Sequence, residues 1–322
     1  MENDSETELR YLEQSVTFLL IRFIISCCAL TGNVIIITTI LRSRRLCARS
    51  YNILIVQLAA SDMIIGVGLL IRVISTIFQR LNPFHEHTQA YCVSVASISV
   101  FGMQFSELTV LMIAVDRMIA IRQPIKYKKK DPFWYPLRCF IACAFLAGVG
   151  VARLYLAADL HQPISVCTLS ASDVRGYTAY WTVFISLCFS AIFALYGYTA
   201  FLVHNKTIKM ECSREKKVFV TIAAVLSSNF ICYICPNIAL LTAMMLRADD
   251  EVISLMILIY GVASGINAAT NILLYGWKYN DLRVAMLKLF GIKKTKEKRS
   301  AKADVVLLDE CSASVLEKDV HL

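Results

Sequence analysis

Charged residues are scarce in this chain. Only 18% of its 322 residues are Asp, Glu, Lys or Arg, whereas 57% are hydrophobic. Soluble globular domains carry about 25% charged residues. The composition therefore excludes an ordinary soluble fold and favours insertion into a membrane.

Histidine is scarce as well, and its placement argues against an enzyme. No apolar stretch combines His, Cys and carboxylate residues at the spacing of a metal site or of a nucleophile and its base. The histidines fall instead in predicted loops and tails, at His85, His87, His161, His204 and His321. We therefore expect no catalytic residues and no cofactor beyond a bound ion.

Internal repeats, low-complexity tracts and flexible linkers are absent from the sequence. Residues 1–14 also lack the basic region and small-residue cleavage pattern of a signal peptide, and carry five acidic residues instead. We expect the first apolar helix to direct insertion and one membrane domain to account for most of the chain.

Long apolar runs are what the chain has in abundance. Seven of them reach or exceed the roughly 20 residues that a helix needs to cross the hydrocarbon core, and none alternates as a strand would. They are Ser15–Leu41, Tyr51–Phe78, Gln89–Ile121, Leu137–Asp159, Tyr180–Val203, Lys217–Leu246 and Val252–Tyr275. The sequence predicts an all-α membrane protein, a seven-transmembrane helix bundle.

Basic residues gather in alternate loops. Clusters begin at Arg42, Arg122, Lys206 and Lys278, whereas the other loops hold chiefly Arg80, Arg175 and Arg247. The positive-inside rule then places the N-terminus outside and the C-terminus in the cytoplasm of a multi-pass plasma-membrane protein. Because the net charge of +9 is segregated in this way, it favours membrane lipid and cytoplasmic partners and no nucleic acid.

The segment after the seventh run is amphipathic. Residues 277–290 place Leu282, Met286, Leu289 and Phe290 on one face, which predicts a short helix lying in the membrane interface. The expected organisation is an extracellular N-terminus (1–14), a seven-transmembrane domain (15–276), this amphipathic interfacial helix (277–290) and a disordered cytoplasmic tail (291–322).

Two cysteines stand apart from the other ten. Cys92 and Arg117 are about 37 Å apart along a helix, so they mark opposite faces of one bilayer. Cys92 and Cys167 both lie on the predicted outer, oxidising face, and we expect a disulfide between them. Asn3 begins a glycosylation sequon on the same side.

Seven short motifs occur in order along the predicted spans. They are Gly32-Asn33, Leu58 to Asp62, Cys92, Asp116-Arg117-Met118, Pro124 with Tyr127, Phe230 with Cys235-Pro236, and Asn271 to Tyr275. In these residues the chain resembles a rhodopsin-like (class A) G-protein-coupled receptor over nearly all of Val16 to Phe290. Each motif alone is weak, but seven in register are specific.

The departures from that family pattern point to a divergent branch. The fourth span lacks its usual Trp, the fifth lacks its Pro, and Ile234 stands where a sixth-span Trp is customary. The residues around Cys167, the run Asn267 to Asn271 and Tyr275-Gly276-Trp277 are similar to those of nematode srsx-type serpentine chemoreceptors.

The resemblance implies a receptor that transmits an extracellular chemical signal to a heterotrimeric G protein by helix rearrangement. In the family, Asp116 holds Arg117 at rest and releases it when the sixth helix, hinged at Pro236, swings outward. The resemblance assigns Tyr198, Asn271 and Tyr275 to the same activation machinery. Ser300, Ser312 and Ser314 of the tail are candidate phosphate acceptors that would recruit arrestin.

Polar residues lie at mid-membrane depth. By resemblance, Asp62, Ser106, Asn267 and Asn271, with Asn33 nearby, form the family's pocket for a sodium ion, and a water-filled hydrogen-bond network is the alternative. Glu107 lies at the same depth as Asp62. Two neighbouring carboxylates in a low dielectric cannot both ionise cheaply, so Glu107 is either a protonation switch or a neutral, hydrogen-bonded packing residue.

The predicted ligand pocket occupies the outer half of the bundle. Ser99 stands where amine receptors place an aspartate, and Gly265 where visual pigments have their retinal lysine. Arg22, Arg72 and Arg153 make the pocket cationic and favour an anionic or peptide ligand, unless these arginines only snorkel to the interface. The other expected wall residues are Ser99, Met103, Gln104, Thr182, Ser186, Asn237 and Met256.

Two alternatives to a signalling receptor stay open from the sequence. Asp62, Glu107 and the arginines could line the ion path of a seven-span channel or transporter, although no inverted repeat is present. The missing Trp and Pro residues are also compatible with a decoy receptor that no longer signals.

Overall fold

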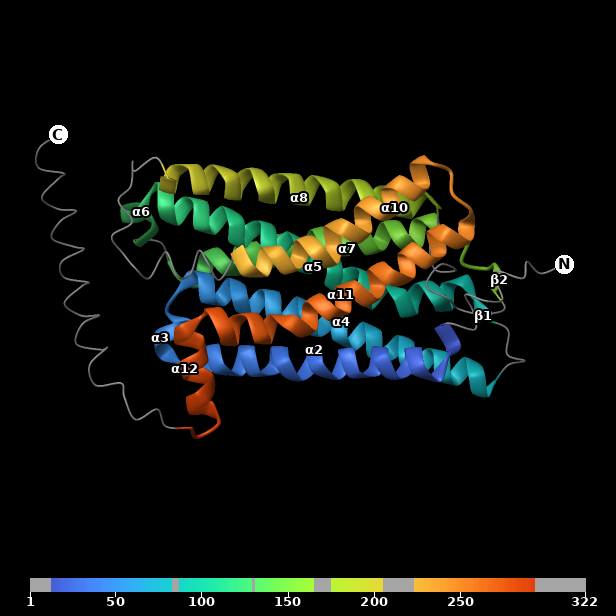
Figure 1. Cartoon of the computed structure of the whole chain (residues 1–322), viewed down its shortest axis with the longest axis horizontal. Helices are drawn as coiled ribbons and strands as arrows, with labels where there is room; N and C mark the ends of the chain where they lie inside the picture. The colour runs from blue at the N-terminus through green and yellow to red at the C-terminus, as the bar shows by residue number, and fades with distance from the viewer. Residues whose placement is uncertain (1–12, 83–86, 129–130, 165–174, 205–222, 293–322) are drawn as a thin grey trace, which may run out of the picture.

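The computed structural model describes residues 13–82, 87–128, 131–164, 175–204 and 223–292. Seven helices in this part of the chain are long and apolar enough to cross a membrane. Figure 1 shows them side by side along the long axis of the molecule. The predicted fold, a seven-transmembrane helix bundle followed by a short amphipathic helix, is confirmed.

The elements keep the chain order of the predicted spans. They are α2 (Val16–Arg42), α3 (Arg44–Cys47), α4 (Ser50–Leu81), β1 (His87–Thr88), α5 (Gln89–Arg122), α6 (Pro124–Lys128), α7 (Trp134–Ala157), β2 (Pro163–Ile164), α8 (Arg175–His204), η1 (Phe230–Ile234), α10 (Cys235–Met245), α11 (Asp250–Lys278) and α12 (Asn280–Leu289). The sixth span comprises Ala223–Met245, so it includes η1 and α10.

Helix α5 is the centre of the bundle, because it packs against α4, α7 and α8, while α2 packs against α4 and α11. Small residues let α5 approach its neighbours closely. A Cβ on Gly68 of α4 would lie 2.2 Å from Ser99 Oγ, and one on Gly150 of α7 would lie 1.8 Å from Gln104 Oε1. Such small-residue contacts are the usual way in which helices associate in lipid.

The sixth span contains a feature that the sequence analysis did not predict. Proline at position 236 has no N–H to donate, so a kink was expected there. The structure adds a π-helical turn, η1, that begins at Phe230 and ends at Ile234, directly before Cys235 and Pro236. π-Helical turns widen a helix locally and are common at functional positions.

Short elements outside the membrane spans close the two ends of the bundle. The strands β1 and β2 pair antiparallel, with His87 opposite Ile164, and tie the start of α5 to the segment after α7. No sequence pattern predicted this pair of strands. At the start of α7, the backbone N–H groups of Trp134 and Phe133 donate to Asp131 Oδ1 and lower the pKa of this carboxyl group from its ordinary value.

Helix α12 lies across the end of the bundle, next to α2 and α11 (Figure 1). Leu282 and Met286 are buried, as the amphipathic pattern predicted, whereas Phe290 is 61% exposed. The apolar face is therefore partly covered by the bundle, and Phe290 lies at its uncovered edge.

Candidate functional site

One end of the bundle, here called the Arg117 end, holds a buried charged pair on α5. Arg117 donates from Nε and Nη2 to Asp116 Oδ2, and both side chains are almost fully buried. Tyr127 of α6 completes the cluster: its hydroxyl accepts from Arg117 Nη2 at 2.7 Å and donates to Asp116 Oδ2 at 2.9 Å. A tyrosine hydroxyl from the neighbouring loop thus bonds both members of the pair, although Met118 occupies the usual tyrosine position of the motif.

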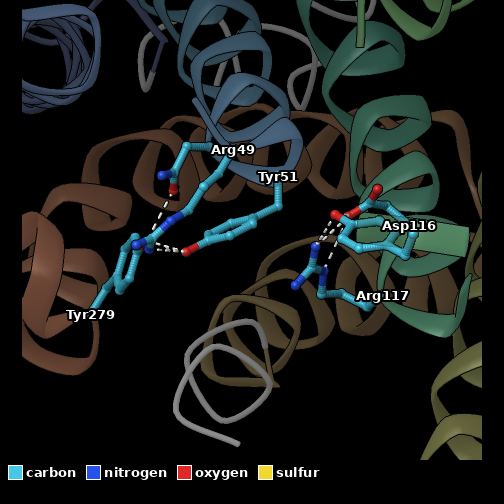
Figure 2. Close-up of polar contacts among 7 residues, drawn as sticks. Arg49, Tyr51, Asp116, Arg117 and Tyr279 are labelled. Atoms are coloured by element: carbon cyan, nitrogen blue, oxygen red, sulfur yellow. Dashed lines mark hydrogen bonds and ion pairs between the residues drawn. The ribbon is translucent and has the colours of Figure 1, made fainter. Parts of the chain in front are cut away.

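A second network adjoins this pair, and sequence reasoning missed it (Figure 2). The Tyr51 hydroxyl at the start of α4 lies 2.6 Å from the Tyr279 hydroxyl, and the Tyr279 hydroxyl lies 3.0 Å from Asn52 Oδ1. Arg49 donates both to the Tyr51 hydroxyl at 2.9 Å and to Asp281 at 3.1 Å. The network therefore joins the start of α4 to the junction between α11 and α12.

The aromatic ring of Tyr51 connects the two networks. The Arg117 guanidinium lies over this ring, with Cζ 4.6 Å from the ring centroid, within the range of a cation–π interaction. The only sequence signal for this arrangement was that Tyr51 begins one apolar run and Tyr279 follows the end of another by four residues.

Two tyrosines of α8 lie near the Arg117 end. Tyr198, the predicted activation residue of the fifth span, points away from the bundle and is 41% exposed. Two residues earlier on α8, Tyr196 faces inward and interacts electrostatically with Arg117 and with the buried Tyr275. Two residues turn a helix by about 200°, so the two side chains lie on opposite faces, and the activation role of Tyr198 stays a prediction.

At mid-depth the structure brings together three of the five predicted polar residues. Ser106 Oγ donates to Asp62 Oδ1 at 3.1 Å, and Asn271 Nδ2 donates to Asp62 Oδ2. All three side chains are at most 1% exposed. Asn271 Oδ1 is buried and has no partner within the described chain.

The other two polar residues bond elsewhere. Asn33 Nδ2 donates to the carbonyl oxygens of Ala29 and Ala268, so it links α2 to α11. Asn267 Oδ1 accepts from Ser228 Oγ of the sixth span at 2.9 Å. The predicted five-residue cluster is thus divided into an Asp62 centre and two separate helix contacts.

The oxygens around Asp62 are suited to a hard cation such as Na⁺. Asp62, Ser106 and the unpartnered amide oxygen of Asn271 would supply the ligands. Within the described residues no group of three or more His, Cys, Asp or Glu side chains converges as a transition-metal site would.

Glu107 is fully buried beside this centre, and neither carboxyl oxygen has a hydrogen-bond partner within the described chain. The hydrogen-bonded packing role considered from the sequence is therefore not observed. The titratable groups that interact with Glu107 come from four different elements: Asp62 of α4, Cys188 of α8, Tyr233 of η1 and Tyr260 of α11.

The opposite end of the bundle, here called the Cys92 end, contains a cavity that encloses about 830 Å³ of empty space, part of it open to solvent. Four predicted pocket residues line it: Arg22, Arg72, Ser99 and Met103. Aromatic residues that sequence reasoning missed form much of the remaining wall, namely Tyr177, Trp181 and Tyr260. The spacing of Tyr177 and Trp181, four residues apart on one helix face, was a signal that could have identified them.

The other six predicted pocket residues do not line this cavity. Gln104 donates to the Tyr177 hydroxyl at 3.0 Å, behind the wall. Arg153 lies over the Tyr180 ring, with Cζ 5.0 Å from the centroid. The remaining four lie on other helix faces, with Asn237 donating to Ser186, Thr182 donating to the Thr178 carbonyl oxygen, and Met256 half-buried.

Several predicted modifications fall at the edge of the described chain or beyond it. Cys92 is disulfide-bonded, and its predicted partner Cys167 lies outside the described residues. Asn3 and the three tail serines also lie outside them.

Comparisons with known proteins agree that this chain is similar to seven-transmembrane G-protein-coupled receptors. A model of the serpentine-type seven-transmembrane G-protein-coupled chemoreceptors, Srsx, matches residues 26–290. The histamine H2 receptor of Rattus norvegicus is 28% identical over 284 residues, which cover 82% of this chain and 76% of the relative. The Homo sapiens histamine H2 receptor is 26% identical (85% and 79% covered), and the Ovis aries adenosine receptor A3 is 22% identical (85% and 89% covered).

Proposed function

Because the chain belongs to the Srsx family of serpentine seven-transmembrane G-protein-coupled receptors, we propose that it is a chemosensory receptor with its ligand cavity at the Cys92 end and its G-protein site at the Arg117 end. One observation carries this proposal: a cavity and a closed Asp116–Arg117–Tyr127 cluster lie at opposite ends of the same central helix, α5.

The orientation follows from chemistry at the two ends. A disulfide at Cys92 requires an oxidising compartment, and the loops at the Arg117 end carry most of the basic residues. In the proposed orientation the cavity opens to the outside of the plasma membrane and α12 lies on the cytoplasmic side.

The closed cluster represents a resting state. Asp116 and Tyr127 both bond Arg117, and Tyr51 covers it, so the guanidinium is occupied within the bundle. G-protein coupling requires these contacts to exchange for contacts with the partner when the sixth span moves. The π-helical turn and Pro236 give that span its hinge.

In the proposed resting state, a Na⁺ ion binds at the Asp62 centre. The ion would neutralise a carboxylate that is costly within the membrane. Asp62, Ser106 and Asn271 would hold it between α4, α5 and α11, and so favour the arrangement in which these helices are close together.

The relatives are named for histamine and adenosine, but the cavity of this chain is not equipped for a cationic amine. Ser99 occupies the position where amine receptors place an aspartate, and no Asp or Glu lines the cavity among the residues that the structure describes. We therefore do not extend the amine ligand of the relatives to this receptor.

The test is G-protein dissociation in cells that express the chain or Arg117→Ala, with surface expression measured in parallel. We expect the variant to lose basal and ligand-evoked signalling while it remains at the surface. Arg122→Ala is the matched control, because Arg122 is exposed in the last turn of the same helix. Equal signalling from wild type and Arg117→Ala would contradict the proposed role of Arg117.

A further inference from the structure

Two buried arginines face the cavity at the Cys92 end. Arg22 of α2 is 3% exposed and Arg72 of α4 is 4% exposed, and both contribute to the cavity wall. A buried charge is costly unless it is paired and hydrogen-bonded. The partners of these two side chains therefore indicate which chemical class of ligand the cavity favours.

Of these two arginines, Arg22 has a hydrogen-bonded ion-pair partner among the residues that the structure describes. Its Nη2 lies 3.1 Å from Glu13 Oε1, and its guanidinium lies over the Phe18 ring at 4.3 Å. Arg72 Nη2 is buried and has no hydrogen-bond partner within the described chain. Glu13 is close enough to attract Arg72 electrostatically, but Arg22 is close enough to repel it.

The rest of the wall is mostly apolar and aromatic, and its other polar members are Ser99, Thr178 and Ser264. Leu69, Val100, Met103 and Leu240 supply aliphatic surface. Trp181 packs edge-on against Tyr260 at 5.9 Å between centroids and stacks on Tyr177 at 6.4 Å.

From these observations, and on the premise of the proposed receptor function, we infer that the cavity binds an organic anion, a carboxylate attached to an apolar or aromatic body, with the carboxylate on Arg72. The planar guanidinium offers two parallel N–H groups to a carboxylate. The anion supplies the missing partner of Arg72, while the hydrophobic body covers Trp181, Tyr260 and the aliphatic wall.

The carboxylate could belong to a free organic acid or to the C-terminus of a hydrophobic peptide. Both present the same group, so the probes separate them. One arm uses decanoate and 4-phenylbutyrate, each beside its amide. The other arm uses short hydrophobic peptides with a free or an amidated C-terminus.

The measurement is the melting temperature of the purified full-length receptor in detergent, with and without each probe. It needs no G protein, so it separates failure of this inference from failure of the proposed signalling function. We expect carboxylates of one arm to raise the melting temperature in a saturable way and their amides to leave it unchanged.

Substitutions of Arg72 test whether this side chain binds the carboxylate. Arg72→Gln should weaken carboxylate binding about 10- to 100-fold, as expected for loss of a charge-assisted hydrogen bond, and Arg72→Lys should lie between Arg72→Gln and wild type. Arg153→Gln is the matched control, because Arg153 lies against Tyr180 and outside the cavity wall; it should bind as wild type does.

The ligand-free protein provides a second, independent readout. Arg72→Leu removes a buried charge whose Nη2 has no hydrogen-bond partner within the described chain, so its melting temperature without ligand should equal or exceed that of wild type, while carboxylates no longer raise it. The inference is overturned if carboxylates and amides act equally, if no carboxylate acts, if Arg72→Gln keeps the response, or if Arg72→Leu melts well below wild type.

Discussion

The Tyr51 ring lies beneath the Arg117 guanidinium at 4.6 Å, and its hydroxyl lies 2.6 Å from that of Tyr279. One side chain thus contacts both the central arginine of α5 and the residue where α11 meets α12. Because α12 is also tied to α4 through Arg49 and Asp281, displacement of α12 would be transmitted to the surroundings of Arg117.

Replacing Tyr51 should raise basal signalling. Tyr51→Leu removes both the cation–π contact and the hydroxyl, each worth about 1 kcal/mol, so the equilibrium should shift away from the resting state by up to about 30-fold. Tyr51→Phe keeps the ring and should have a smaller effect. Basal G-protein dissociation at matched surface expression is the measurement, with Tyr155→Phe as control, because the Tyr155 hydroxyl bonds Ser94 near the Cys92 end. A Tyr51→Leu receptor as quiet as wild type would show that the ring does not restrain Arg117.

The packing of helix α12 against the bundle should depend on one buried apolar side chain. Leu282 is fully buried, so Leu282→Ala should cost about 2 to 5 kcal/mol if the site does not collapse. We expect a lower melting temperature and easier proteolytic cleavage near residue 282. Phe290→Ala, a change at a 61% exposed position, should leave both quantities unchanged. Equal behaviour of the two variants would mean that α12 is not anchored through Leu282.

Sodium should stabilise the receptor through Asp62. Exchanging NaCl for choline chloride at constant ionic strength should lower the melting temperature of wild type, because the ion binds the folded state selectively. Asp62→Asn lacks the negative charge and should melt at one temperature in both salts. Asn33→Ala, which removes contacts to α2 and α11 backbone only, should keep the sodium response at a lower melting temperature. An unchanged sodium response in Asp62→Asn would place the ion elsewhere.

Replacing the buried carboxyl group of Glu107 by an apolar side chain should stabilise the protein. Both of its carboxyl oxygens are buried without partners, so Glu107→Leu should raise the melting temperature. The matched change Gln104→Leu breaks an observed hydrogen bond to Tyr177 and should lower it.

The same residue has a functional test. If Glu107 is a protonation switch, the pH dependence of basal signalling in wild type should disappear in Glu107→Gln, which mimics the protonated side chain. Parallel pH profiles of the two proteins would limit Glu107 to a structural role.

Helix depth and apolar periodicity predicted much of this architecture. Apart from the start of the sixth span, where the described residues begin at Ala223, the observed spans begin and end within a few residues of the apolar runs, because a bilayer requires a fixed length of apolar helix. Counting residues from Arg117 placed Ser106 at the depth of Asp62, and the structure shows them bonded. Both relations follow from the constant rise per residue of a helix, so they can be predicted by counting residues along the sequence.

Contacts that depend on helix rotation or on loops were harder to predict. Arg153 was placed in the cavity, and the inward-facing Tyr196 was overlooked, because a depth estimate does not say which face a residue occupies. The bonds of Tyr127, Tyr51 and Tyr279 join separate segments near the ends of spans, where no periodic pattern operates. The π-helical turn at Phe230–Ile234 likewise depends on packing that local sequence does not encode.

That turn has a consequence for alignment with other receptors. A π-helical turn holds one more residue than an α-helical turn, which amounts to about 100° of rotation about the helix axis. Positions on the Pro236 side of the turn are thus out of phase with those on its other side. A relative whose sixth span is uniformly α-helical would need a one-residue gap here. Deleting one residue from Phe230–Ile234 should therefore remove the π-helical turn while Asn237 and Leu240 keep facing the bundle interior, where both are now buried.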